Sequence, residues 1–496
     1  MLQSATEILA QETANLHSTL NPLELLTPTN YLTERQKWLD GGRKFINPHF
    51  VYDEAAIRHA SCQIAKILQN LDEIQQYFFK FDASDPLYLV SESLFERGAE
   101  LAHLRIILDG IASPTKATYV IAWNRIYGNL QSIDIDLAEA MIGKNPAATL
   151  IEKYIDNAEL PETSRQKNAK FFKENLNGFR GAFSETKKTR LKSLTFDANG
   201  IAKYFQLTLD YMRKHAHFGA RMGIEEENSP TYLIDVSSRY TSVCTLASSA
   251  SGKSIIGIPA NRKVNGLRLI ELIGHELNSH YRSAMNTRNL FRNILEYRQK
   301  SDFISLAPLL SHSLNKTMSE GFAKLSDTQV LGVSGLPKPY PILAASFIEQ
   351  GHNFQETMEY VFDLSLRNHR SEDVALDNAW KIAYRLFRGQ TDTSSHCGYV
   401  FTKDKSYFCG FTRLLNEISR NDGAPFEETI GNFLRYSTLT AKEIQTIDEY
   451  VKKSGVTSND PFRDLPIFIR PKKNSPISSP FNGLDSPTIY IAELLL

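Results

Sequence analysis

Hydrophobic residues recur at helical spacing through most of the first half of the chain. Apolar residues at i, i+3, i+4 and i+7 place one apolar face on an α-helix. This pattern covers residues 4–20, 55–69, 87–107, 116–128, 137–141 and 201–213, and it is broken at Pro86, Pro114, Pro146 and Pro161. Two proline-bearing turns, at residues 27–30 and 47–52, bracket a further short helix. We therefore predict an N-terminal half that is almost entirely helical.

The period of the pattern changes from 3.6 residues to two after residue 231. Residues 232–236, 242–246 and 254–259 alternate in the way that predicts short strands. Residues 266–286 return to helical spacing, with an apolar first half that we expect to be buried. Helical spacing resumes from residue 288 to 440, except for a loop and a short strand expected within residues 390–408. The predicted fold class is α+β, predominantly helical, with a small sheet beside a long helix.

The pattern also suggests how the chain is divided. Pro, Ser and Asn become frequent from residue 454 and periodicity disappears, which predicts an extended tail, packed over the surface or partly disordered. We divide the chain into an N-terminal helix (1–26), a helical part (27–225), a part that carries the motif described below (226–445) and a Pro/Ser-rich extension (446–496). The charged residues within 167–192 indicate a solvated helix face; a docking surface for an acidic partner is the alternative.

Composition narrows the classes of function. Lys and Arg number 56 and are offset by 56 Asp and Glu, so net charge gives no reason to expect nucleic acid or an acidic membrane as a partner. The four cysteines are widely spread, which fits a reducing compartment. The first residues, Met1 to Glu7, lack the basic and apolar pattern of a secretory signal, so we expect no signal peptide. No apolar run approaches the roughly 18 residues of a membrane span. We expect a cytoplasmic protein, with signal-independent export left open.

The most informative stretch is the pair His275-Glu276 followed by His280. Two imidazoles, one carboxylate ligand and a second carboxylate that acts as a base are what a zinc hydrolase needs. However, the two histidines are five residues apart, and a step of five on an α-helix turns the side chain by about 140°. Both can bind one ion only if the helix is locally widened by an inserted residue, a π-bulge of the kind found at functional sites.

A second acid in helical context lies downstream, in Ser319-Glu320-Gly321. Our hypothesis is that His275, His280 and Glu320 hold one Zn²⁺ per chain, while Glu276 takes the proton of the attacking water. Asp327 could orient a ligand histidine from behind. The alternative is an amphipathic helix with two surface histidines, followed by solvated acids.

A group of polar residues near residue 400 supplies candidates for substrate binding. Arg388, Lys403 and Tyr407 are of the types that bind a terminal carboxylate or donate to an oxyanion. Structural ion pairs and core tyrosines explain such residues equally well. His396 is a further candidate donor, and Cys409 is expected to be a packed thiol.

Taken in order, these residues resemble the tyrosine carboxypeptidase family, which includes the microtubule-associated tyrosine carboxypeptidases and bacterial proteins named for a Gln-Glu-Gly-Leu-Ala motif. The resemblance spans roughly residues 27–440. It rests on residues 27–30 and 47–52, His275-Glu276, His280, Asn286, the motif at 319–323, Arg388-Gly389, and residues 401–404 with Tyr407 and Gly410. Ser319 and Phe322 stand where the bacterial motif has Gln and Leu, and Leu277, Asn278 and Ser279 replace the usual residues between the histidines.

The resemblance implies a zincin-like zinc carboxypeptidase, with the two histidines and Glu320 as ligands and Glu276 as the catalytic acid. Animal members of the family remove the C-terminal tyrosine of α-tubulin, so the implied partner is a peptide or protein C-terminus, including an acidic, tubulin-like tail. Two alternatives stay open at this stage. One is an endopeptidase or amidase that uses the same zinc centre, and the other is a non-catalytic regulatory protein that retains the fold.

Overall fold

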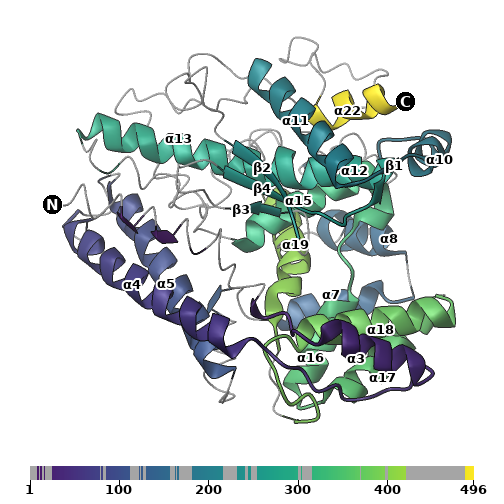
Figure 1. The fold of residues 1–496 in the computed structure, drawn as a ribbon. Helices are drawn as coiled ribbons and strands as arrows, with labels where there is room; N and C mark the ends of the chain where they lie inside the picture. Colours follow the sequence, from purple (N-terminus) through teal and green to yellow (C-terminus); the bar gives the residue numbers. More distant parts are fainter. Residues whose placement is uncertain are drawn as a thin grey trace.

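Figure 1 shows the computed structural model of the chain, which is predominantly helical with a small sheet. It describes residues 25–78, 87–111, 130–143, 145–156, 181–215, 232–238, 244–246, 254–299, 316–368, 370–396, 400–420 and 486–496, with scattered single residues up to 303. None of the helices in these ranges is long and apolar enough to cross a lipid bilayer.

The first half is predominantly helical as predicted, and its helices include those expected at 55–69, 87–107, 137–141 and 201–213 and the short one between the two turns. The described helices of this half are α3 (Tyr31–Asp40), α4 (Glu54–Phe78), α5 (Leu87–Gly110), α7 (Ser132–Met141), α8 (Pro146–Ile151), the π-helical η1 (Glu152–Asp156), α10 (Glu185–Ser193) and α11 (Ala198–Lys214). Helix α4 buries Ile57, Ile64, Ile67 and Leu71 along one side and packs against α5. The helix expected at 116–128 and most of the one expected at 4–20 lie outside the described residues.

The three expected strands are present. Strands β2 (Tyr232–Ser237), β3 (Cys244–Leu246) and β4 (Ser254–Pro259) form a sheet in the order β2-β4-β3, in which β2 is parallel and β3 antiparallel to β4. A second antiparallel pair, β1 (Thr195–Phe196) with β5 (Val264–Asn265), escaped prediction because strands of two residues carry no period.

One long helix then crosses the middle of the molecule. Helix α12 (Gly266–Leu272) continues without a break into the π-helical η4 (Ile273–Tyr281) and α13 (Arg282–Tyr297). Its start is fixed by Asn265, whose side chain accepts a hydrogen bond from Arg268 N at 2.9 Å. All of α12 except Arg268 is buried, as expected from the apolar first half of this segment.

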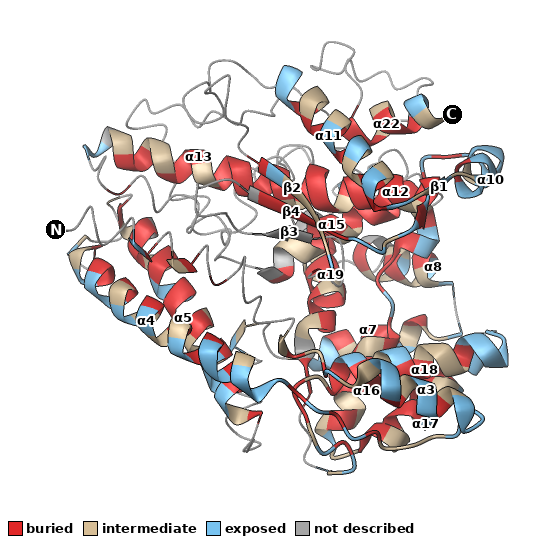
Figure 2. Ribbon diagram, in the orientation of Figure 1, coloured by how far each residue is buried: buried red, intermediate tan, exposed pale blue. Residues whose placement is uncertain are grey.

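The second half adds more helices to both sides of the long helix. They are α15 (Lys316–Leu331), the short 3₁₀-helix η6 (Gly332–Gly335), α16 (Tyr340–Glu349), α17 (Phe354–Arg367), α18 (Glu372–Leu386), η7 (Thr402–Asp404), α19 (Lys405–Arg420) and α22 (Pro487–Leu495). Buried residues concentrate along α12, α15 and α19, whereas α3, α4 and α18 expose one side (Figure 2).

Two expectations were wrong. The short strand predicted to end at residue 408 is instead a 3₁₀ turn and the start of α19, whose Phe408 and Phe411 are buried on a helix rather than alternating along a strand. The prediction of an extended tail is wrong for the last residues, which form α22 and bury Ile491 and Ala492. The rest of that segment, up to residue 485, lies outside the described residues.

The two N-terminal turns pack against the region that follows α18. Asn30 donates to His49 O at 2.7 Å and accepts from Val51 N at 2.9 Å, which ties the turns together. The hydroxyl of Tyr52 accepts a hydrogen bond from Gly389 N at 2.8 Å. Residues that lie more than 300 positions apart in sequence therefore shape one turn.

Candidate metal centre

The π-helical segment η4 carries both histidines. Its nine residues, Ile273–Tyr281, widen the long helix at the place where the five-residue spacing required it. The hydroxyl of Ser279 donates to Gly274 O at 3.0 Å, which spans the same five-residue step. The rings of His275 and His280 consequently lie on one side of the helix, with centroids 5.1 Å apart. The expectation of a widened helix is confirmed.

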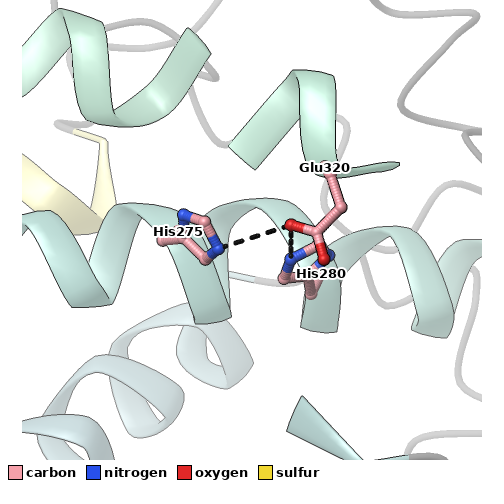
Figure 3. Close-up of side chains that lie close together, drawn as sticks. All are labelled: His275, His280 and Glu320. Atoms are coloured by element: carbon pink, nitrogen blue, oxygen red, sulfur yellow. Dashed lines mark ion pairs between the residues drawn. The ribbon is translucent and has the colours of Figure 1, made fainter. Parts of the chain in front are cut away.

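Helix α15 brings the third candidate ligand to the histidines. Glu320 Oε2 lies 3.7 Å from His275 Nε2 and 3.4 Å from His280 Nε2, and it points between the two rings (Figure 3). One ligand atom from each of these three side chains, called the triad below, lies within 4.8 Å of the other two. Helix α15 packs closely on this segment, because a Cβ on Gly274 would come within 2.9 Å of Ser326 Oγ and the serine side chain would have to move.

Each histidine of the triad also has a polar partner at Nδ1, the ring nitrogen that does not face Glu320. His275 Nδ1 lies 3.2 Å from Asp327 Oδ1, and Lys324 Nζ lies 2.7 Å from the other oxygen of that carboxylate. Because a carboxylate only accepts hydrogen bonds, Nδ1 carries the proton and the lone pair of a neutral ring is on Nε2, which faces Glu320. His280 Nδ1 lies 2.9 Å from Ser319 Oγ.

Asp327 therefore contacts a ligand histidine, as the sequence analysis suggested. The contact of Ser319 with His280 was not predicted. Ser319 and His280 are 39 residues apart in sequence, and a serine at the start of a helix carries no sign of a distant imidazole. The only available signal was its position next to Glu320.

Charge is concentrated at the triad. The pKa of Glu320 falls to about 2, because the attraction of His280, His275 and Lys403 outweighs the opposing effect of burial. Burial alone would lower the pKa of His275, but Asp327, Glu276 and Glu320 raise it to about 9. Three carboxylates thus face one imidazole, an environment that stabilises a cation.

The residues present fit a zinc ion. Two imidazoles and one carboxylate are a ligand set of catalytic zinc sites, which keep a fourth position open. Glu320 Oε2 is buried, and its contacts with His280 Nε2 at 3.4 Å and His275 Nε2 at 3.7 Å are long for hydrogen bonds, as expected for ligand atoms arranged around a metal ion. Both rings present Nε2 to this oxygen and use Nδ1 for the partner behind.

Helix α19 reaches the triad through a crossing of two glycines. A Cβ at Gly321 on α15 would overlap the backbone of Gly410 on α19, and a Cβ at Gly410 would overlap Thr317 O. The two backbones are therefore in contact, as only glycine allows. Glu320 lies next to this crossing, within reach of the residues at the start of α19.

Two of the three substrate-binding candidates lie beside the triad. The ring of Tyr407 is centred 6.3 Å from that of His275, and the pKa of its phenol is raised well above 10, first by the charge of Glu320 and then by burial. Lys403 lies close enough to Glu320 to lower the pKa of that carboxyl.

The other candidates are packed differently. The guanidinium group of Arg388 lies over the rings of Tyr384 and Phe401, 5.2 and 5.9 Å from their centroids. His396 lies 3.5 Å from Glu356 at the start of α17. The Cys409 thiol is buried and donates to Asp134 at 3.2 Å, which confirms that it is a packed thiol.

Comparisons with known proteins give no family for this chain. No protein-family model matches it, and no curated protein sequence matches it. One solved structure, described as a putative lipoprotein of unknown function from Shewanella oneidensis, aligns with 80% of this chain and 73% of its own, at 11% identity and a TM-score of 0.33. A likeness this distant says nothing about fold or activity.

Proposed function

We propose that this protein is a zinc-dependent carboxypeptidase with a zincin-like active site. The observation that carries the proposal is the π-helical segment, which turns two histidines five residues apart toward one carboxylate on a neighbouring helix. A regular α-helix would direct them about 140° apart, and a widened helix is otherwise an uncommon feature. The resemblance to the tyrosine carboxypeptidases supports the same reading through the residues quoted above.

The side chains around the triad would divide the catalytic work. A bound zinc ion would act as a Lewis acid that lowers the pKa of water toward about 7. Glu276 is buried and follows His275 directly, so it can accept the proton of the attacking water and pass it to the leaving amine. Tyr407 stays protonated because its pKa is raised, and its phenol can donate a hydrogen bond to the oxygen that gains charge.

Lys403 supports release of a C-terminal residue rather than internal cleavage. It is partly exposed beside Glu320, and no ion pair of Lys403 with a carboxylate is present among the described residues. A substrate whose terminal carboxylate binds Lys403 would place its last peptide bond near the triad. The released residue, by resemblance, is an aromatic one such as tyrosine. An endopeptidase with the same centre would not need this cation.

The test is hydrolysis of a peptide library in which each sequence carries either a free or an amidated C-terminus. We expect release of the last residue from free C-termini only, about one zinc per chain, and a Glu276→Gln variant that keeps its zinc while losing turnover. Cleavage of amidated peptides would favour the endopeptidase. Zinc-loaded protein without hydrolysis of any peptide would favour the non-catalytic regulatory protein.

The cytoplasm is the compartment that we propose for this activity. Cys62, which is exposed, and the buried Cys409 are both free thiols, in keeping with a reducing environment.

A further inference from the structure

The C-terminal helix α22 (Pro487–Leu495) packs directly against the helix that carries the histidines. It contacts α11, α12 and η4, and Figure 1 shows it beside α11 and α12. Ser486 caps its start by accepting a hydrogen bond from Ile489 N at 3.3 Å. Ile491 is completely buried, whereas Leu494 is 53% exposed, so the helix has one docked side and one solvated side.

The contact reaches the π-helical segment at the residue before His275. Thr488 Oγ1 lies 3.7 Å from the position that a Cβ on Gly274 would occupy, and Ser326 of α15 approaches the same position at 2.9 Å. Ile491 belongs to the same buried cluster as Ile273 and Leu277 of η4. Segment η4 is therefore held between α15 and α22, with Gly274 enclosed by both.

Tyr490 and Leu495 add further contacts between α22 and its neighbours. The ring of Tyr490 stacks on that of Tyr211 in α11, with centroids 4.1 Å apart and an angle of 13° between the planes. Leu495 packs against two buried clusters, the one that contains Ile491 and a smaller one around Ile270. Helix α22 thus packs at once against α11 and against the continuous helix formed by α12 and η4.

Packing of this kind matters most for a helix with an unfavourable local geometry. π-helices are rare and appear mostly as single-turn bulges inside α-helices, whereas η4 has nine residues. If η4 relaxed to regular α-helical spacing, the side chains at positions 275 and 280 would diverge by about 140° and could not share an ion. The widened geometry therefore depends on the elements that pack against η4.

We propose that docked α22 acts as a strap that keeps η4 π-helical and thereby controls metal binding. The inference rests on the metal site of the proposed function and adds a conformational requirement to it. When only part of the population has α22 docked, the apparent zinc affinity falls in proportion to that fraction.

The test compares Ile491→Ala with Leu494→Ala in the full-length chain. Both remove an aliphatic side chain from the same helix, but only the first side chain is buried in the docked contact. Zinc dissociation constants are measured by competition with a fluorescent chelator. We expect Ile491→Ala to bind zinc at least about tenfold more weakly, because this truncation undocks a short helix, and Leu494→Ala to stay within about twofold of the unmodified chain.

Two further measurements keep the outcome clear. Near-ultraviolet circular dichroism, to which the stacked pair Trp38 and Trp380 contributes, reports whether the distant helices stay folded. Hydrogen exchange of the backbone amides of η4 should speed up in zinc-free Ile491→Ala and not in Leu494→Ala. If Ile491→Ala loses the dichroism signal, Tyr490→Ala takes its place. It removes the stack on Tyr211 and the packing of a partly buried ring against the cluster that contains Ile491, so we expect zinc binding to weaken by about threefold or more.

The results separate the strap from the metal site itself. If Ile491→Ala and Tyr490→Ala bind zinc as tightly as the unmodified chain does, the proposal that α22 controls metal binding is wrong and the proposed function still stands. An unmodified chain that binds no zinc would overturn both.

Discussion

Two clusters of two histidines and one glutamate lie within the part of the chain that the structure describes, and they differ in what surrounds them. The second cluster, called the surface cluster, consists of His352, His396 and Glu356 near the start of α17. Its nitrogen-to-oxygen distances, 3.2 and 3.5 Å, are as short as the 3.7 and 3.4 Å of the triad. Residue types and pair distances alone would therefore not tell the two apart.

The triad and the surface cluster differ in burial and in the contacts that hold their side chains. The triad side chains are 16–19% exposed and have partners behind both rings, whereas those of the surface cluster are 36–60% exposed. Glu356 is engaged in capping α17, where it accepts from Asn353 N at 2.9 Å. Within the described ranges, only the triad brings three ligand atoms within 4.8 Å of one another. The comparison indicates that convergence on rigid, packed helices defines the site.

The largest difference between the two clusters should appear when the glutamate of each is replaced by glutamine. Glu320→Gln should abolish tight zinc binding, because it removes the carboxylate ligand, whereas Glu356→Gln should leave one zinc per chain. Zinc content after dialysis, measured by elemental analysis, checks both variants. Equal zinc content in the two would mean that the triad is not the metal site.

Replacing Asp327 or Ser319, which contact the Nδ1 atoms of the two histidines, should have the next largest effect on zinc binding. Asp327→Asn keeps the shape but removes the charge that fixes the His275 ring, and it should weaken zinc binding about 10- to 100-fold. Ser319→Ala should weaken it less, because a neutral hydroxyl holds His280. Chelator competition measures both affinities. The reverse order of the two effects would contradict the stronger role given to the carboxylate.

The glycine crossing should affect substrate binding more than metal binding. Gly321→Ala would force α15 and α19 apart, since the new Cβ overlaps Gly410, and we expect a loss of about 1–3 kcal/mol in the free energy of unfolding with a raised KM. Gly110→Ala is the control, because a Cβ there meets nothing within 4 Å. Thermal unfolding and peptide kinetics are the measurements; equal effects of the two changes would refute the crossing as the cause.

The surface cluster should contribute only to local stability, with a dependence on pH. The backbone hydrogen bond from Asn353, followed by His352 and His396, lowers the pKa of Glu356 below its usual value of 4.5. A lowered folded pKa means that the contribution is present above about pH 4.5 and is lost as pH falls further. Because solvent screens this side chain, which is 39% exposed, Glu356→Gln should cost under about 1 kcal/mol at pH 7 and less at pH 3, by chemical unfolding. A cost that grows toward acid would contradict this sign.

Sequence reasoning succeeded where a residue type and a local spacing carry the information. The periods of α4 and β2 predicted their elements, and the five-residue interval between His275 and His280 predicted a widened helix. The candidate ligands were found in the same way, because imidazole and carboxylate are chemically distinctive wherever they occur.

Sequence reasoning failed where a feature depends on contacts between segments that are far apart in the chain. Ser319 and His280 meet only because α15 packs on η4, and Gly321 gives no sign of its partner Gly410, 89 residues on. Helix α22 follows a Pro- and Ser-rich segment and is only nine residues long, too short for periodicity to stand out. The aromatic residues of α19 favour strands in general, and burial against α15 overrides that preference.

The central claim is that His275, His280 and Glu320 bind a single zinc ion, and one titration tests it most directly. Metal-free protein and its His280→Ala variant are titrated with zinc against a chelator of known affinity. We predict one tight site per chain in the unmodified protein and none in the variant. Binding of equal strength in both, or no tight site in either, would contradict the claim.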